Sequence, residues 1–330
     1  MDTSTTMEIA TKRKRNPSIE DLNDPSKQAG YLLRFHDNPL KDNERLPLPI
    51  LPEVFRLVTY PNYEAAVGLI DDAANFHLML RIIGDPGSGK SRILLEYKKK
   101  SKIEAHYIGV PKHCSDKELL LLVSSAMGYY PYASTSTLQL ELISHINDQA
   151  KPIVFLIDEV DNMCPKTRKK NASNIDKLDV LRFIWDHTRR YASFIFAAPY
   201  DLEAKIQKSD ENITNSQLYR RCPAHIMTGM PEKEARILLS CIEEDFKIIF
   251  DDAVRSKLLN RIHQIKRGGL GVTLDILFRT MMIEIPGMKS FYNALLNDID
   301  REEALKRYIN HQEPILISEG ALMGAMSMQR

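Results

Sequence analysis

Short apolar runs separated by longer amphipathic stretches dominate the middle of the chain. The runs predict buried β-strands at residues 77–83, 105–110, 152–157, 193–198 and 226–229. Residues 152–157 are apolar throughout, as expected of a central strand that is buried on both faces. Because helix-length stretches separate successive strands, the pattern predicts an α/β fold with a central parallel sheet flanked by helices.

Helical periodicity fills the intervening stretches and takes over after Pro231. No apolar β run interrupts it between residue 232 and about residue 310, which predicts a small all-helical domain. Ser115, followed by acidic residues, is a predicted helix cap. The predicted organisation is a flexible polar arm at 1–45, an α/β core at 46–230, the helical domain at 231–310, and a flexible methionine-rich tail at 311–330.

A glycine-rich turn follows the first predicted strand. Residues 84–91 fit the P-loop pattern, in which backbone N–H groups surround a β-phosphate, the lysine reaches the β- and γ-phosphates, and the last hydroxyl contacts Mg²⁺. An ordinary strand–turn–helix is the alternative. The pattern predicts ATP and Mg²⁺ as cofactors, with these residues at the nucleotide: Gly84, Asp85, Pro86, Gly87, Ser88, Gly89, Lys90, Ser91 and Arg92. Lys90 is also a predicted catalytic residue, and Ser91 a metal ligand.

Two adjacent carboxylates end the apolar run 152–157. In a P-loop NTPase the first acid at such a strand end helps to hold Mg²⁺, so Asp158 is the predicted second metal ligand. Glu159 is the predicted catalytic base that polarises a water molecule. The alternative is an acidic strand end that caps a helix.

Charge that builds on a γ-phosphoryl group calls for a further cation, often an arginine from a neighbouring subunit. Arg220 and Arg221 lie just before the last predicted strand. They are candidates for that role, with a pair of surface arginines as the alternative.

Composition limits the other possibilities. The chain has 330 residues, with 45 Lys and Arg against 44 Asp and Glu, so any contact with nucleic acid must use local patches. The four cysteines lack metal-site spacing and fit a reducing cytoplasm. No apolar run approaches the ~20 residues of a membrane span, so no membrane partner is expected.

The motifs together resemble a family, the AAA+ ATPases that regulate DNA transposition (the MuB, TnsC and TniB type). The resemblance covers about residues 55–285 and is carried by the P-loop at 84–91, the acidic block 158–163, the segment 217–225 and the stretch 107–119. In 217–225 the arginine of the family falls on Arg221. The resemblance implies an AAA+ core followed by a helical lid, in which Arg221 completes the ATP site of the next subunit.

The resemblance also implies partners. Subunits with ATP would form a homo-oligomeric ring or helical filament around double-stranded DNA and link a target selector to a transposase. The selector would dock on the N-terminal arm or a face of the ring, and the transposase on the C-terminal tail.

DNA binding needs groups that contact phosphates without reading sequence. The candidates are basic and hydroxyl side chains: Lys112, His113, Lys117, Ser134, Thr135, Lys166, Arg168 and Lys169. For the run at 166–170, a solvated loop is the alternative.

Two positions depart from the family pattern. Pro199 stands where a polar first sensor is usual, and Thr273 stands where the lid commonly supplies an arginine. Both changes remove groups that would contact the γ-phosphate. We therefore expect slow hydrolysis, with ATP acting as an assembly switch.

Two other functions stay open. A replication initiator or clamp-loader-like AAA+ ATPase shares the core and the interface arginine, but predicts a winged-helix domain after the lid, where few residues remain. A signalling AAA+ or STAND-like ATPase would have no DNA role, and its oligomers would ignore DNA.

Overall fold

The computed structural model describes residues 54–112, 114–129, 133–163, 176–200, 221–263, 269–297, 299–311 and 313–327. All of them belong to the unit Ile50–Arg330. The predicted arm at 1–45 lies outside the described residues. None of the described helices is long and apolar enough to cross a membrane.

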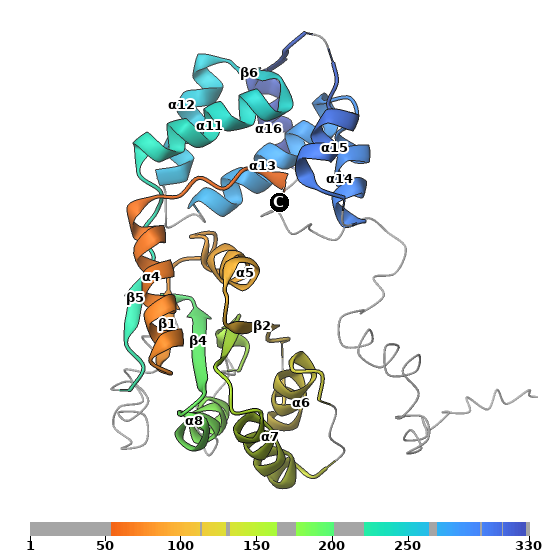
Figure 1. Ribbon diagram of the computed structural model, residues 1–330. Helices are drawn as coiled ribbons and strands as arrows, with labels where there is room; N and C mark the ends of the chain where they lie inside the picture. Colours follow the sequence, from red (N-terminus) through yellow and green to blue (C-terminus); the bar gives the residue numbers. More distant parts are fainter. Residues whose placement is uncertain are drawn as a thin grey trace, which may run out of the picture. The chain divides into compact units, whose positions relative to one another are not determined.

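A five-stranded parallel sheet forms the centre of the fold, in the order β2-β3-β4-β1-β5 (Figure 1). Its strands are β1 (Met79–Ile83), β2 (Glu104–Gly109), β3 (Ile153–Asp158), β4 (Ala192–Ala198) and β5 (Ala224–Ile226). Every residue of β1, β3 and β4 is buried, which explains their continuous apolar runs. The predicted parallel sheet is confirmed, although the last strand ends at Ile226 and not at Gly229.

Helices cover both faces of this sheet because successive strand side chains point to opposite faces. Leu80 and Ile82 pack with α4 (Pro61–Asn75) and α5 (Lys90–Lys100). Met79 belongs to the core of the other face. The helices of that face are α6 (Asp116–Ala126), α7 (Thr135–Gln149) and α8 (Asp176–Thr188).

The predicted cap at Ser115 is confirmed. The Ser115 hydroxyl accepts from the Glu118 backbone N–H at 3.2 Å, and the Glu118 carboxylate accepts from the Ser115 N–H at 2.6 Å. This capping box fixes the start of α6 just after the carboxyl end of β2.

A predominantly helical region follows β5 and fits a lid. Its elements are α11 (Glu232–Phe246), β6 (Ile248–Phe250), α12 (Asp252–His263), α13 (Gly269–Glu284), α14 (Met288–Leu296), α15 (Arg301–Tyr308), β7 (Ile315–Ile317) and α16 (Glu319–Ser327). Its apolar core is continuous with the α4 and α5 side of the sheet. The lid differs from the predicted all-helical domain because β6 and β7 pair in parallel, with Ile248 opposite Ile315.

The predicted flexible tail at 311–330 is wrong for most of its length. Ile315–Ile317 is strand β7, and Glu319–Ser327 is helix α16, which packs on α13. Leu322 and Ala325 of α16 are buried in the lid core. The small residues that resemble a flexible tail in sequence also permit close helix packing, and local sequence does not distinguish the two cases.

Replacing Leu322 tests whether the C-terminal segment is part of the lid. Leu322 is 1% exposed, so Leu322→Ala should lower the free energy of unfolding by ~2–5 kcal/mol through lost burial and a cavity. Urea denaturation followed by circular dichroism measures the change. Met323→Ala, at a 50% exposed position of the same helix, is the matched control. Equal small effects of the two variants would mean that the segment does not stabilise the lid.

Candidate nucleotide-binding site

The P-loop follows the carboxyl end of β1 and leads directly into α5. Gly87 and Gly89 adopt φ values of 80° and 95°, in the left-handed region that favours glycine. Helix α5 begins at Lys90, immediately after Gly89. The N–H groups of its first turn, which find no partner within the helix itself, and its positive dipole end therefore face the turn, as an anion site requires.

The ammonium group of Lys90 lies inside this loop. Its Nζ donates to the carbonyl oxygens of Gly84 and Asp85 at 2.8 and 2.9 Å, and more weakly to the Ser88 hydroxyl at 3.5 Å. Burial lowers the pKa of Lys90, and the charges of Asp158 and Asp85 oppose that shift. The amine is thus positioned beside acceptors that it can exchange for phosphate oxygens.

Asp158, at the end of β3, is a buried carboxylate with only 3% of its surface exposed. Its Oδ2 accepts from the Tyr107 hydroxyl at 2.8 Å, and its Oδ1 accepts from the Glu159 backbone N–H at 2.8 Å. Burial, followed by the Asp158 charge, raises the pKa of Tyr107, so this hydroxyl stays a donor. Each carboxylate oxygen keeps an unused lone pair that a metal or its water can occupy.

Glu159 has an unusual backbone conformation for a residue with a side chain. Its φ is 55°, a left-handed conformation that costs ~1–2 kcal/mol in a non-glycine residue. Asn162 Nδ2 donates to Glu159 Oε2 at 3.0 Å and to the Val110 carbonyl at 2.7 Å. Burial, followed by the Asp158 charge, raises the pKa of Glu159. Asn162 therefore links Glu159 to the chain just after β2.

A cavity of about 320 Å³ adjoins the P-loop. Gly89, Lys90 and Ser91 are among the residues that line it. The walls come from the segment before α4 and from the lid, and they are mostly apolar: Phe55, Leu57, Val58, Tyr60, Met230, Leu238, Leu270 and Leu274. Apolar walls beside an anion site suit a ligand that has a flat base at one end and phosphates at the other.

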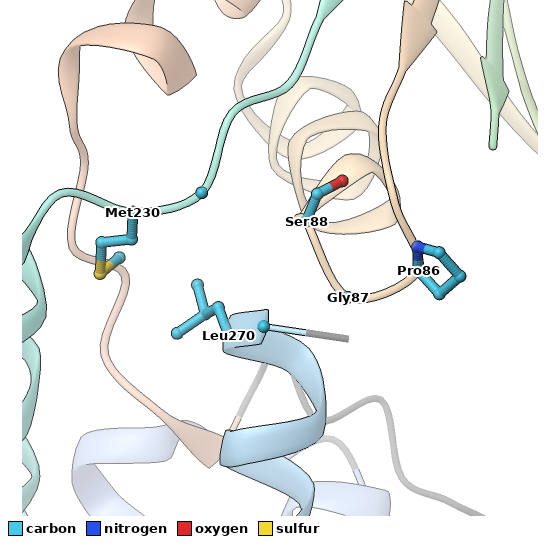
Figure 2. A pocket seen from close by; sticks show the side chains of 7 residues that line it. Pro86, Gly87, Ser88, Met230 and Leu270 are labelled. Atoms are coloured by element: carbon cyan, nitrogen blue, oxygen red, sulfur yellow. The ribbon is translucent and has the colours of Figure 1, made fainter. Parts of the chain in front are cut away.

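The lid contacts the P-loop directly. Gly271, near the start of α13, donates its backbone N–H to the Gly87 carbonyl at 2.9 Å. Figure 2 shows the same junction, where Leu270 and Met230 lie across from the Gly87 turn. A Cβ on Gly271 would lie 2.6 Å from the Gly87 Cα, so only glycine allows this approach. The lid is therefore joined to the P-loop by a direct contact between backbones.

These groups fit a nucleoside triphosphate with Mg²⁺. The glycine turn and the start of α5 suit the phosphates, while Ser91 and Asp158 offer the oxygen ligands that Mg²⁺ prefers. The turn itself contains Gly84, Asp85 and Ser88, and it exposes Pro86. Arg92 lines the cavity. The structure thus brings the predicted nucleotide residues together, and their catalytic roles stay predictions.

Arg221 lies far from this site within one chain. It precedes β5, at the amino-terminal edge of the sheet, whereas the P-loop follows the carboxyl end of the parallel strand β1. A five-residue strand separates these edges by roughly 16 Å. Arg221 instead pairs with Asp186 of α8 at 2.7 Å. Arg220 is outside the described residues.

The candidate DNA contacts are only partly described. Lys112, Lys117, Ser134 and Thr135 are exposed. Ser134 also caps α7, because its hydroxyl accepts from the Thr137 N–H at 3.4 Å. His113, Lys166, Arg168 and Lys169 lie outside the described residues.

Neither departing sensor position supplies a polar group to the cavity. Thr273 is buried, and its hydroxyl donates to the Gly269 carbonyl of its own helix at 2.8 Å. Pro199 follows the end of β4.

Several residues of the site escaped prediction. Tyr107 and Gly271 each act through a partner far away in sequence, so no local pattern identifies them. Asn162 lies within the acidic block 158–163, where its position three residues after Glu159 was the available signal.

Comparison with known proteins agrees with this geometry. Residues 75–206 match the protein family described as AAA domain. The five-stranded sheet, the P-loop and the lid give this chain the AAA+ P-loop fold. No curated protein sequence matches it.

Solved structures extend the likeness beyond the AAA domain. The ORC2 protein of Aeropyrum pernix, in ADPNP-ADP complexes, matches 88% of this chain and 70% of its own, at 14% identity and a TM-score of 0.53. Cdc6p of Pyrobaculum aerophilum matches 87% of this chain and 73% of its own, at 16% identity and a TM-score of 0.47. RuvB of Thermotoga maritima matches 84% of this chain and 73% of its own, at 13% identity and a TM-score of 0.43. At such identity the ORC2 likeness shows the fold alone.

Substitution of Gly271 tests the contact between the lid and the P-loop. Gly271→Ala should weaken ADP binding by about tenfold or more, because overpacking costs ~1–3 kcal/mol and must move α13 away from Gly87. Calorimetric titration with ADP measures the effect. Gly68→Ala in α4, where an added Cβ meets nothing within 4 Å, is the control and should leave the affinity unchanged. An unchanged affinity in Gly271→Ala would show that lid closure does not depend on this contact.

Proposed function

We propose that the protein is an ATP-dependent, sequence-nonspecific regulator of DNA transposition that binds double-stranded DNA as a homo-oligomer. Its sequence motifs resemble that family, and its fold is that of an AAA+ ATPase. ATP and Mg²⁺ are the proposed cofactors, and the cytoplasm is the proposed compartment. Lys90 and Ser91 bind phosphates and metal, Asp158 completes the metal site, and Glu159 polarises water.

The observation that carries the proposal is the bridge made by Asn162. Its amide joins the catalytic candidate Glu159 to the Val110 carbonyl, two residues before the exposed Lys112. The charge of Lys112 also favours the ionised form of Glu159. A phosphate that draws Lys112 away would therefore alter both the position and the charge balance of Glu159. This arrangement supports communication between DNA and the ATP site.

Assembly of subunits would bring Arg221 to the γ-phosphate of a neighbouring ATP site as the further cation. Arg221 lies at the sheet edge opposite the P-loop, so it reaches an ATP site only when that site belongs to a neighbour. To do so it must exchange Asp186 for the phosphates of that site. ATP would then stabilise the oligomer by ligand linkage.

The proposed partners are double-stranded DNA, a transposase and a target selector. Because residues 315–327 are folded into the lid, a transposase would use the exposed side chains of this segment, such as Leu316 and Met323, instead of a free tail. The selector is assigned to the arm at 1–45 or to a face of the oligomer.

A replication initiator or clamp-loader-like ATPase is the second candidate, and the ORC2 likeness fits it as well. Both candidates use ATP and DNA. Co-purification with a transposase subunit favours the first, and loading of a helicase or sliding clamp favours the second. A signalling ATPase would show neither.

Nucleotide-dependent DNA binding is the direct test. Random duplex DNA should bind tightly with ATP and at least tenfold more weakly with ADP or without nucleotide, as measured by fluorescence polarisation. Lys90→Ala should lose the ATP effect because the phosphate contact is gone. Glu159→Gln should keep binding and slow the release. The control Lys98→Ala, exposed at the far end of α5, should behave like the wild type. Binding that ignores nucleotide would contradict the switch.

Mixing experiments test the role of Arg221 in a neighbouring site. Arg221→Ala and Lys90→Ala should each abolish DNA-stimulated ATP hydrolysis, measured by phosphate release. A mixture should regain part of the activity, because a Lys90→Ala subunit can supply Arg221 to an intact site. Arg189→Ala, an exposed arginine near the same sheet edge, is the control and should retain activity. If the mixture regains no ATP hydrolysis, Arg221 does not act in the ATP site of a neighbouring subunit.

A further inference from the structure

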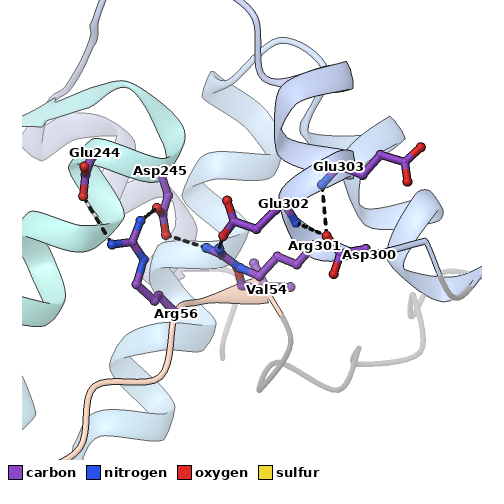
Figure 3. A network of polar contacts seen from close by, with 8 residues as sticks. All are labelled: Val54, Arg56, Glu244, Asp245, Asp300, Arg301, Glu302 and Glu303. Atoms are coloured by element: carbon purple, nitrogen blue, oxygen red, sulfur yellow. Dashed lines mark hydrogen bonds and ion pairs between the residues drawn. The ribbon is translucent and has the colours of Figure 1, made fainter.

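One wall of the nucleotide cavity is tied to the lid by buried charge. The segment 55–58, which we call the base wall, lines the same cavity as Lys90 and Ser91. Arg56 lies in this wall, but its guanidinium group reaches the lid. It pairs there with Glu244 at 3.3 Å and with Asp245, both in α11 (Figure 3).

Asp245 is the centre of this network. Its side chain is 3% exposed, and its two carboxylate oxygens are divided between two arginines. Oδ1 accepts from Arg56, and Oδ2 accepts from Arg301 of α15 at 2.5 Å. A buried carboxylate is costly unless it is paired on both oxygens, so the geometry of the three side chains is strongly fixed.

Arg301 closes the network back onto the wall. Its Nε donates to the Val54 carbonyl at 3.0 Å, one residue before the base wall begins. Asp245 therefore holds the base wall twice, directly through Arg56 and indirectly through Arg301 and Val54. Figure 3 shows all these groups converging where the segment before α4 meets α11 and α15.

The position of the network separates it from the phosphate end of the cavity. None of its members contacts the P-loop among the interactions described, whereas the P-loop is contacted by Gly271. A change at Asp245 should therefore move the wall that faces a base and leave the phosphate cradle in place.

We propose that Asp245 is a positioning residue that sets the selectivity of the site for a purine base, by fixing the base wall against the lid. This inference rests on the proposed nucleotide site. The base wall lines the same cavity as the lid residues Leu270 and Leu274. Because a purine is larger than a pyrimidine, its affinity should depend more on the spacing between these walls. Loss of the network should therefore penalise purine nucleotides selectively.

The test compares ADP with CDP, which share ribose and phosphates but differ in the size of the base. In Asp245→Asn, the affinity for ADP should fall about tenfold, and that for CDP should change by less than about twofold, measured by calorimetric titration of the full chain. The variant keeps the side-chain volume, and each arginine retains a second carboxylate, Glu244 or Glu302. Arg301→Gln removes the second arginine that pairs with Asp245. It should also lower the ratio of the ADP affinity to the CDP affinity.

Glu243→Gln is the matched control. It breaks a different ion pair of α11, with Arg255, that does not touch the base wall. Its ratio of ADP to CDP affinity should equal that of the wild type. An unchanged ratio in both Asp245→Asn and Arg301→Gln, or an equal loss for ADP and CDP, would overturn the inference. Nucleotide-independent DNA binding by the wild type would instead overturn the proposed function and leave this ratio intact.

Discussion

The site depends on one constraint: three buried parallel strands must end at the same edge of the sheet. β4 lies between β1 and β3, and its register places Ala198 beside Ile83 and Phe196 beside Ile157. The P-loop and Asp158 belong to distant parts of the sequence, yet they must emerge together because their strands share this register. The electrostatic interaction between Lys90 and Asp158 therefore depends on the sheet register together with the P-loop.

Local sequence was sufficient for the parts of the molecule that local physics determines. Buried strands gave apolar runs, the phosphate turn required its glycines, and Ser115 with Glu118 formed a recognisable cap. The β6–β7 pair was missed because each strand has three residues and the paired residues, such as Ile248 and Ile315, are 67 positions apart in the sequence. Tyr107 and Gly271 were missed for the same reason, since their roles exist only through contacts that the fold creates. The low-complexity appearance of α16 concealed a packed helix.

The lid acts on the cavity mainly through shape. Its described residues in the cavity are apolar or glycine, so they can exclude water and enclose a base but cannot neutralise phosphate charge. Backbone contact at Gly87 holds the lid on the P-loop, and Asp245 holds it on the base wall through Arg56. Charge stabilisation is therefore left to the P-loop and, under the proposed function, to Arg221 of a neighbour.

The pairing of β6 with β7 has a consequence for biosynthesis. β6 follows the first lid helix, but its partner strand and the helix after it are made only when residues up to Ser327 have been synthesised. The α/β core can form while the chain is still emerging from the ribosome, since domains fold as units during synthesis. The lid residues that line the cavity lie between Met230 and Leu274, but α13 packs on α16. The lid side of the cavity therefore gains its full support only after the segment 315–327 has left the ribosome.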